Sequence, residues 1–191
     1  MGGSYVNEAG VFLIEVLFGL YILAVMLRFL FQMVRADFYN PFSQAIVQIT
    51  NPPLRALRRW IPSIGRIDTA SLVLMTVVQF ASTWLVVLLS NGRGALLGIF
   101  IIALAKLLQT AVYVFMFAIL ILVILSWVAP GAYNPAVDLL RSLSRPLLAP
   151  ARRVIPPIGN LDLSAMVVLV LLQLALILLV APIRDIGIRL L

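Results

Sequence analysis

Four long apolar segments, separated by loops of unequal length, dominate the pattern of hydrophobic and polar positions. A helix that crosses a membrane needs about 20 mostly apolar residues. Four stretches meet this requirement, at about 11–33, 69–89, 107–128 and 163–183. The third apolar run begins near Ala95, but Lys106 interrupts it, so its membrane span is predicted after that lysine. The pattern therefore predicts an all-α membrane protein with four transmembrane helices.

The composition agrees with a chain whose surface faces lipid. Hydrophobic residues make up 63% of the chain and charged residues only 11%, whereas soluble domains carry about 25% charged residues. The N-terminus lacks the basic segment and small-residue cleavage site of a signal peptide. The first apolar run is therefore predicted to remain as a membrane span.

Basic residues concentrate in the two long loops, which hold nine of the fourteen arginines and lysines. They are Arg35, Arg55, Arg58, Arg59 and Arg66 in the first loop, and Arg141, Arg145, Arg152 and Arg153 in the second. Loops rich in basic residues usually face the cytoplasm, so both loops are predicted there and both termini outside. Because no basic run stands clear of the apolar segments, no direct nucleic-acid partner is expected.

The second half of the sequence contains a repeat of a segment of the first half. The segment that starts at Tyr39 reappears at Tyr133, with an offset of 94 residues and no gap. From Tyr39 to Phe80, 14 of 42 positions are identical. The sequence thus predicts two tandem helical hairpins, residues 1–93 and 94–191, which cross the membrane in the same sense about an axis along its normal.

The repeated loop carries the pattern YNP…RR-x-IP-x-IG…D. Its asparagine is expected to cap a short helix that starts at the proline, its second proline to stop a helix, its glycine to make a tight turn, and its aspartate to cap the returning span. In the first loop, one helix is predicted over about 41–50 and a second is predicted to restart at Asn51. The motif residues are Asn40, Pro41, Pro62, Gly65 and Asp68, and Asn134, Pro135, Pro156, Gly159 and Asp162.

The loop helices are predicted to be amphipathic and to lie along the membrane surface with their apolar faces down. This places the pairs Arg58–Arg59 and Arg152–Arg153 near lipid phosphates. Three interpretations stay open: the arginines only fix topology and anchor the loop, they form an anion or lipid-headgroup site shared between the loops, or they dock a protein partner.

A few polar residues lie inside the predicted spans. Gln79 and Gln173 occupy equivalent positions near the bilayer midplane and are expected to hydrogen-bond to each other, or alternatively to line a polar pathway. Glu15 is expected to pair with Lys106 or to reach interfacial water, with proton or cation coupling as the alternative. Arg28 is expected to extend to the cytoplasmic headgroups.

The residue inventory gives little support to catalysis. The chain has no cysteine and no histidine, which excludes disulfides, thiolate chemistry and imidazole metal sites. No metal-ligand cluster or glycine-rich phosphate loop stands in the sequence. We therefore expect no enzyme activity, cofactor or metal. The pattern Gly94-x-x-x-Gly98 is a weak small-residue motif and is expected to be incidental.

The duplicated loop pattern between apolar hairpins resembles the YggT family of small bacterial membrane proteins, called YlmG in plastids and cyanobacteria. The likeness covers nearly the whole chain, although Leu147 and Ala149 replace Pro53 and Arg55 in the second loop. The resemblance implies a multi-pass protein of the bacterial inner membrane. It also implies links to osmotic-stress tolerance and ion homeostasis, to division or envelope organisation and, in plastids, to nucleoid distribution and cytochrome maturation. The family supplies no agreed catalytic site.

Two hypotheses about function follow. In the first, the chain is a membrane scaffold or assembly factor whose basic loops dock anionic lipid headgroups, a second copy of the chain, or another membrane protein. In the second, it is a component of a small channel or transporter that acts under osmotic stress. The second hypothesis needs an oligomer, because four helices alone enclose little space.

Overall fold

The computed structural model describes residues 2–65, 67–90, 94–129, 131, 134–155 and 162–191. Within these residues the chain is helical, and four of its helices are long and apolar enough to cross a membrane. They are α1 (Gly2–Val34), α3 (Thr69–Leu89), α4 (Leu96–Val128) and a final helix composed of α6 (Leu163–Ala175), a π-helical stretch (Leu176–Val180) and α7 (Ala181–Arg189). Two further helices lie in the loops: α2 (Pro41–Arg58) and α5 (Pro135–Val154).

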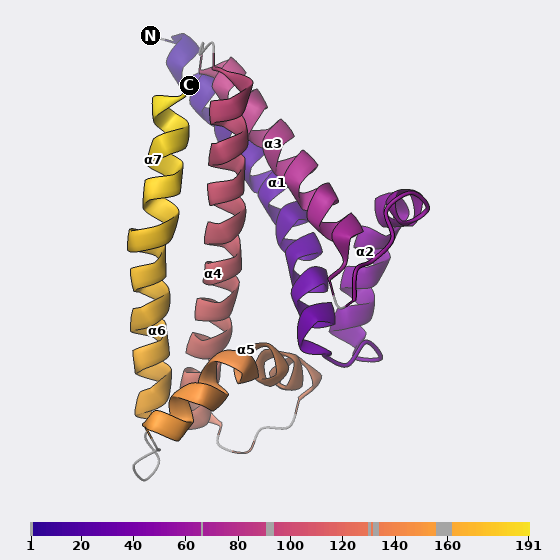
Figure 1. The fold of residues 1–191 in the computed structure, drawn as a ribbon, viewed down its shortest axis with the longest axis vertical. Helices are drawn as coiled ribbons and strands as arrows, with labels where there is room; N and C mark the ends of the chain where they lie inside the picture. Colours follow the sequence, from indigo (N-terminus) through magenta and orange to yellow (C-terminus); the bar gives the residue numbers. More distant parts are fainter. Residues whose placement is uncertain (1, 66, 91–93, 130, 132–133, 156–161) are drawn as a thin grey trace.

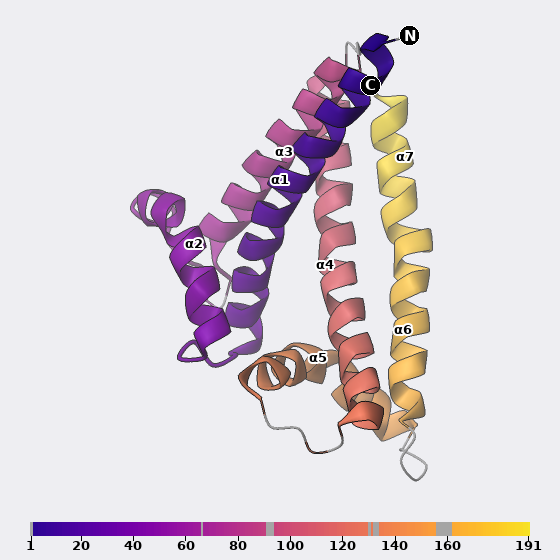
Figure 2. The same cartoon turned by 180° about the vertical axis from the view of Figure 1, so that it is seen from behind.

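The helices form two hairpins (Figures 1 and 2). Helices α1 and α3 run side by side in opposite directions, and α4 runs alongside the α6–α7 helix in the same way. Both loop helices lie toward one end of the molecule, and both chain termini lie at the other end (Figure 1). The arginines of α2 and α5 therefore lie toward one end of the helical bundle.

The helix that holds the predicted third span begins earlier than that span. Helix α4 begins at Leu96 and continues through Lys106 without a break. Lysine is a good helix former, and the charge of this lysine is paired with Glu15. A single paired charge therefore does not end the helix.

The helix that holds the predicted fourth span is longer than that span and contains a widened turn. It continues beyond residue 183 to Arg189. The π-helical stretch Leu176–Val180 lies just before Pro182. Proline has no backbone N–H for the carbonyl four residues earlier and its ring crowds that carbonyl. A local π turn accommodates both effects without ending the helix.

Each loop contains one long helix, so the restart predicted at Asn51 is wrong. Helix α2 continues through Pro52 and Pro53, and α5 continues through Pro146 and Pro150. Both helices change direction along their length (Figure 1). Internal prolines bend a helix in this way because they remove backbone hydrogen bonds.

The apolar core joins the two halves of the chain. Its main cluster packs α1 and α3 against both loop helices and the middle of α4. Its large, fully buried side chains include Ile22, Val25, Leu54, Met75 and Leu143. A smaller cluster around Ile119 and Leu148 holds α4, α5 and α6 together. The loop helices are thus parts of the core and hold their polar side chains in defined places.

Helices α4 and α7 cross closely at two glycines. A Cβ atom added to Gly98 would lie 2.8 Å from the carbonyl oxygen of Gly187. A Cβ atom on Gly187 would lie 2.7 Å from Cγ1 of Ile102. Small residues at such crossings let helix backbones approach in a membrane. The expectation that the Gly94–Gly98 pattern is incidental is therefore wrong for Gly98.

Candidate functional site

The loop motif builds the helix ends that the sequence predicts. The side chains of Asn40 and Asn134 each accept an N–H bond at 3.0 Å, from Phe42 and Ala136, and Pro41 and Pro135 begin the two loop helices. Asp68 and Asp162 cap the returning spans α3 and α6. These four caps confirm the local interpretation of the motif.

The turn after α2 also follows the motif. Gly65 has a φ angle of +60°, a backbone conformation that favours glycine. Ile64 and Ile67 exchange backbone hydrogen bonds of 3.1 and 3.0 Å across this turn. Pro62 lies beyond the end of α2, and its carbonyl accepts a bond from the Thr69 hydroxyl at 2.6 Å. Pro156 and Gly159, the equivalent residues of the second loop, lie outside the described residues.

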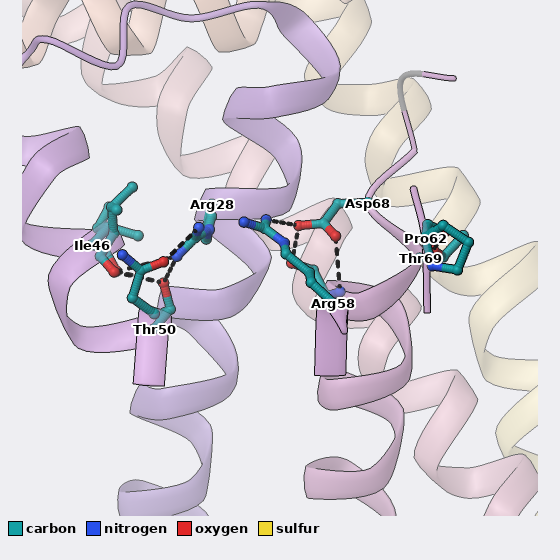
Figure 3. Close-up of polar contacts among 10 residues, drawn as sticks. Arg28, Ile46, Thr50, Arg58, Pro62, Asp68 and Thr69 are labelled. Carbon is teal, nitrogen blue, oxygen red and sulfur yellow. Dashed lines mark hydrogen bonds and ion pairs between the residues drawn. The ribbon is translucent and has the colours of Figure 1, made fainter. Parts of the chain in front are cut away.

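One arginine of each loop pair holds the aspartate that caps the next span. Arg58 forms an ion pair with Asp68 (Figure 3), and Arg152 forms one with Asp162 at 2.7 Å. Burial by itself raises the pKa of both carboxyl groups. Hydrogen bonds from the arginine and from Ser71 or Ser164, together with the arginine charge, outweigh burial and hold each pKa below its ordinary value. Both aspartates are therefore ionised at neutral pH.

The second arginine of each pair faces outward. Arg59 and Arg153 are exposed, and neither has an ion-pair partner among the described residues. The same holds for Arg55 on α2 and Arg145 on α5. We call these four residues the basic face. Binding of lipid or anions by Arg58, Arg59, Arg152 and Arg153 stays a prediction. The structure shows that Arg58 and Arg152, although also exposed, are each paired with an aspartate.

Arg28 does not extend to the headgroups, so that expectation is wrong. Its side chain is only 5% exposed and turns from α1 toward α2 (Figure 3). It donates to the Thr50 hydroxyl at 2.8 Å, to the Asn51 side-chain oxygen at 3.0 Å and to the Val47 carbonyl at 3.3 Å. A buried guanidinium needs such acceptors, and the loop helix supplies them.

A polar cluster lies among the membrane spans, between α1, α3 and α4. The Lys106 ammonium donates to the Glu15 carboxylate at 3.0 Å, which confirms the predicted pairing. Gln79 is 6% exposed and donates to the Thr83 hydroxyl at 3.4 Å. Glu15, Lys106 and Gln79 border a cavity of about 220 Å³. Its polar lining is Glu15, Gln79, Ser82, Lys106, Gln109, Thr110 and Tyr113.

Four of these polar residues were missed from the sequence, although the sequence holds a signal for each of them. Gln109, Thr110 and Tyr113 follow Lys106 at three, four and seven residues, the spacing of one helical face. Ser82 follows Gln79 by three residues on α3, so it lies on the same face.

Gln173 does not join this cluster. It is exposed on α6 and has no hydrogen-bond partner among the described residues. Helix α6 packs against α4 and α5, whereas α3 packs against α1, α2 and α4. The predicted Gln79–Gln173 hydrogen bond is therefore wrong, because the two helices that carry these residues do not meet.

Besides their shared apolar core, the two loops are joined by one hydrogen bond among the residues that the structure describes. The Asn40 side chain donates to the carbonyl oxygen of Pro135 at 2.6 Å. Asn40 is buried, whereas the equivalent Asn134 is exposed. The first loop thus fastens the start of α5, and this contact is not reciprocal within the described residues.

Together, these features define a multi-pass helical membrane protein with arginine-rich loop helices at one end and a polar cluster among its spans. The chain belongs to the CCB3/YggT family, whose model matches residues 8–89 and 101–183.

Similar proteins occur in several bacteria. An uncharacterised protein of Pseudomonas aeruginosa is 44% identical over 170 residues, which cover 88% of this chain and 86% of that protein. An uncharacterised protein of Vibrio alginolyticus is also 44% identical, over 86% of this chain and 89% of its own length. The uncharacterised protein YggT of Escherichia coli K12 is 37% identical, over 84% of both chains. No solved structure gives a significant match.

Proposed function

We propose that this chain is a non-enzymatic scaffold or assembly factor of the bacterial inner membrane, which acts through its two basic loops. In this proposal the loops face the cytoplasm and the termini face the periplasm, as the excess of loop arginines favours. Through the family resemblance, the role would serve osmotic-stress tolerance and the organisation of the envelope or of division.

The same proposal treats the two halves as tandem copies of one hairpin unit. The family model matches twice, over 8–89 and over 101–183. Each half has the order span, loop helix, span, with an asparagine cap on the loop helix and an aspartate cap on the returning span. Two copies of one unit would bring two basic loop helices to the same membrane surface.

The basic face is the observation that carries the proposal. Its four exposed arginines lie on α2, on the residue that caps its end, and on α5, toward one end of the molecule. Arg28, Arg58 and Arg152 are bound within the chain. The loop helices also turn apolar residues, such as Leu54 and Leu143, into the core. Each basic residue near an anionic leaflet contributes about 1 kcal/mol of attraction, so the face is suited to anionic headgroups.

Trp60 provides a test of this contact. It follows Arg59 and is 82% exposed. In a Trp84→Phe/Trp127→Phe background, reconstituted protein should show stronger Trp60 quenching by brominated phosphatidylglycerol than by brominated phosphatidylcholine at equal mole fraction. Arg55→Ala/Arg59→Ala should reduce this preference by up to about fivefold for each arginine.

Arg189→Ala is the matched control, because Arg189 is an exposed arginine at the opposite end of the bundle. It should leave the quenching of Trp60 unchanged. Equal quenching by the two lipids in the parent protein would contradict the proposal.

The polar cluster favours a second candidate function, an oligomeric channel or transporter component for ions under osmotic stress. An ion pair and several hydroxyl and amide groups around one cavity are costly in a bilayer and often mark a transport pathway. The cavity holds Glu15, Gln79 and Lys106.

Ion flux into liposomes tests this candidate. Gln79→Ala should reduce flux severalfold, because Gln79 lines the cavity. Gln173→Ala should have no effect, because Gln173 is exposed elsewhere. Absence of flux in the parent protein would eliminate the transport function.

A further inference from the structure

The two halves use equivalent positions around their loop helices in different ways. In the first half, Arg28 extends from α1 and binds the side chains of Thr50 and Asn51 and the carbonyl of Val47 on α2. Its guanidinium is buried and fills the space between span and loop helix (Figure 3). The contact thus closes the space between α1 and α2 in the first half.

The second half lacks this internal guanidinium. At the offset of 94 residues, Leu122 stands in the place of Arg28, and Ser144 stands in the place of Thr50. The Ser144 hydroxyl is buried and has no hydrogen-bond partner among the described residues. Buried hydroxyls normally have a hydrogen-bond partner. The second half therefore keeps the buried Ser144 hydroxyl but lacks the guanidinium donor that Arg28 supplies in the first half.

Two arginines are present on the loop helix instead. Arg141 and Arg145 of α5 occupy the positions of Val47 and Asn51, whose oxygen atoms accept bonds from Arg28 in the first half. The positive charge has therefore moved from the span to the loop helix. The first half has one span arginine bound to acceptors on the loop helix. The second half has two arginines on the loop helix and a leucine on the span.

These residues border a large cavity between α4, α5 and α6. Its volume is about 880 Å³, and its lining includes Leu122, Arg141, Arg145 and Arg152. Spans α4 and α6 add apolar residues, among them Ile119 and Ala165. Cavities of about 300–1,000 Å³ are typical ligand sites. This one combines a basic side with an apolar side.

The arginines differ in how firmly they are held. Arg152 is committed to Asp162 at 2.7 Å. Arg141 forms an exposed contact of 3.4 Å with Asp138, a kind of pair that contributes little to stability. Arg145 has no ion-pair partner among the described residues. Two guanidinium groups can thus turn toward a ligand, and planar guanidinium groups bind phosphate oxygens in pairs.

We propose that the second half binds a phosphate group in this cavity, through Arg141 and Arg145, with the apolar wall of α4 beside it. This inference rests on the proposed function, which assigns the role to the basic loops. It deepens that function by placing a specific phosphate contact on α5. Among the described residues of the first half, Arg28 occupies the corresponding space, and Val47 and Asn51 carry no charge.

Isothermal titration of the detergent-purified full chain tests the site with three probes. Dioctanoyl phosphatidic acid and inorganic phosphate carry the phosphate, and dioctanoylglycerol lacks it. Binding of phosphatidic acid alone identifies a lipid headgroup, and binding of inorganic phosphate as well identifies a free-phosphate site. Binding of dioctanoylglycerol as tight as that of phosphatidic acid, or no binding of either phosphate probe, overturns the proposal.

Arg145→Ala should weaken binding of the phosphate probe by about tenfold or more, because it removes a charged hydrogen-bond donor. Arg145 is exposed, so the change should leave the thermal midpoint nearly unaltered. Arg145→Lys should restore part of the affinity, since lysine keeps the charge but not the planar fork. Unchanged affinity in Arg145→Ala contradicts the assignment.

Leu122→Arg distinguishes a specific phosphate site from general electrostatic attraction to a basic protein. It installs the guanidinium of the first half, which should fill the cavity, donate to Ser144 and weaken phosphate binding. Attraction by net charge alone would instead strengthen binding, because the variant is more basic. Leu122→Ala is the control, which keeps the charge and the open cavity and should keep binding.

The outcome is distinguishable from that of the Trp60 experiment. Arg55 and Arg59 lie on α2, outside the lining of this cavity. Loss of Trp60 quenching with intact phosphate titration would contradict the proposed surface contact alone. Intact quenching without phosphate titration would contradict the cavity site alone.

Discussion

At the residue scale, each returning span begins with an aspartate that serves two partners. Asp68 and Asp162 cap their helices and also hold Arg58 and Arg152 of the preceding loop helix. Their lowered pKa values mean that the folded chain stabilises the ionised carboxylates. This stabilisation is complete above the ordinary carboxyl pKa and is lost as pH falls through the lowered value.

We therefore expect Asp68→Asn/Asp162→Asn to lower stability at pH 7 and to flatten its fall in acid. Asparagine still caps a helix, so the change isolates the charge. The loss should be about 1–3 kcal/mol at Asp68, whose side chain is buried, and below about 1 kcal/mol at the more exposed Arg152–Asp162 pair. Thermal unfolding in detergent across the acid range measures both effects. Asp185→Asn is the control, since Asp185 is exposed and lies 3.8 Å from its arginine partner. An unchanged acid profile in the double variant would count against this account.

At the element scale, the close crossing of α4 and α7 depends on the absence of a side chain at Gly98. A Cβ atom there would meet backbone atoms at 2.8 Å, and backbone cannot move aside as the end of a flexible side chain can. The crossing fastens the C-terminal helix to α4 and so holds the second hairpin together near the chain termini.

Gly98→Ala should destabilise the protein in detergent by about 1–3 kcal/mol through overpacking. Gly19→Ala is the matched control, because a Cβ atom at Gly19 would meet no atom within 4 Å. Alanine is the better helix former by up to about 1 kcal/mol, so this control should be neutral or stabilising. Equal thermal midpoints for the two variants would show that the crossing tolerates a methyl group.

At the scale of the whole molecule, two similar halves become unlike parts. Gln79 is buried beside the Glu15–Lys106 pair, while Gln173 is exposed. Arg28 closes the space beneath the first loop helix, while Leu122 borders an open cavity beneath the second. The difference arises because each half packs against the other through unequal surfaces, as the one-way bond from Asn40 to Pro135 shows. The two candidate sites therefore lie in different parts of the molecule, the polar cluster between the first hairpin and α4, and the arginine cavity within the second half.

The sequence by itself determined the features that depend on neighbouring residues along the chain. Apolar length identified the spans, and the Asn-Pro, Gly65 and aspartate positions identified the caps and the turn, because local hydrogen bonds and φ preferences decide them. It also predicted the pairing of Glu15 with Lys106, two opposite charges at similar depth in the spans. Only the tertiary structure decided where Arg28 points, which arginine of each pair is held by an aspartate, and which glutamine is buried. These outcomes depend on which helices pack together, and the two copies of the loop motif do not encode that packing.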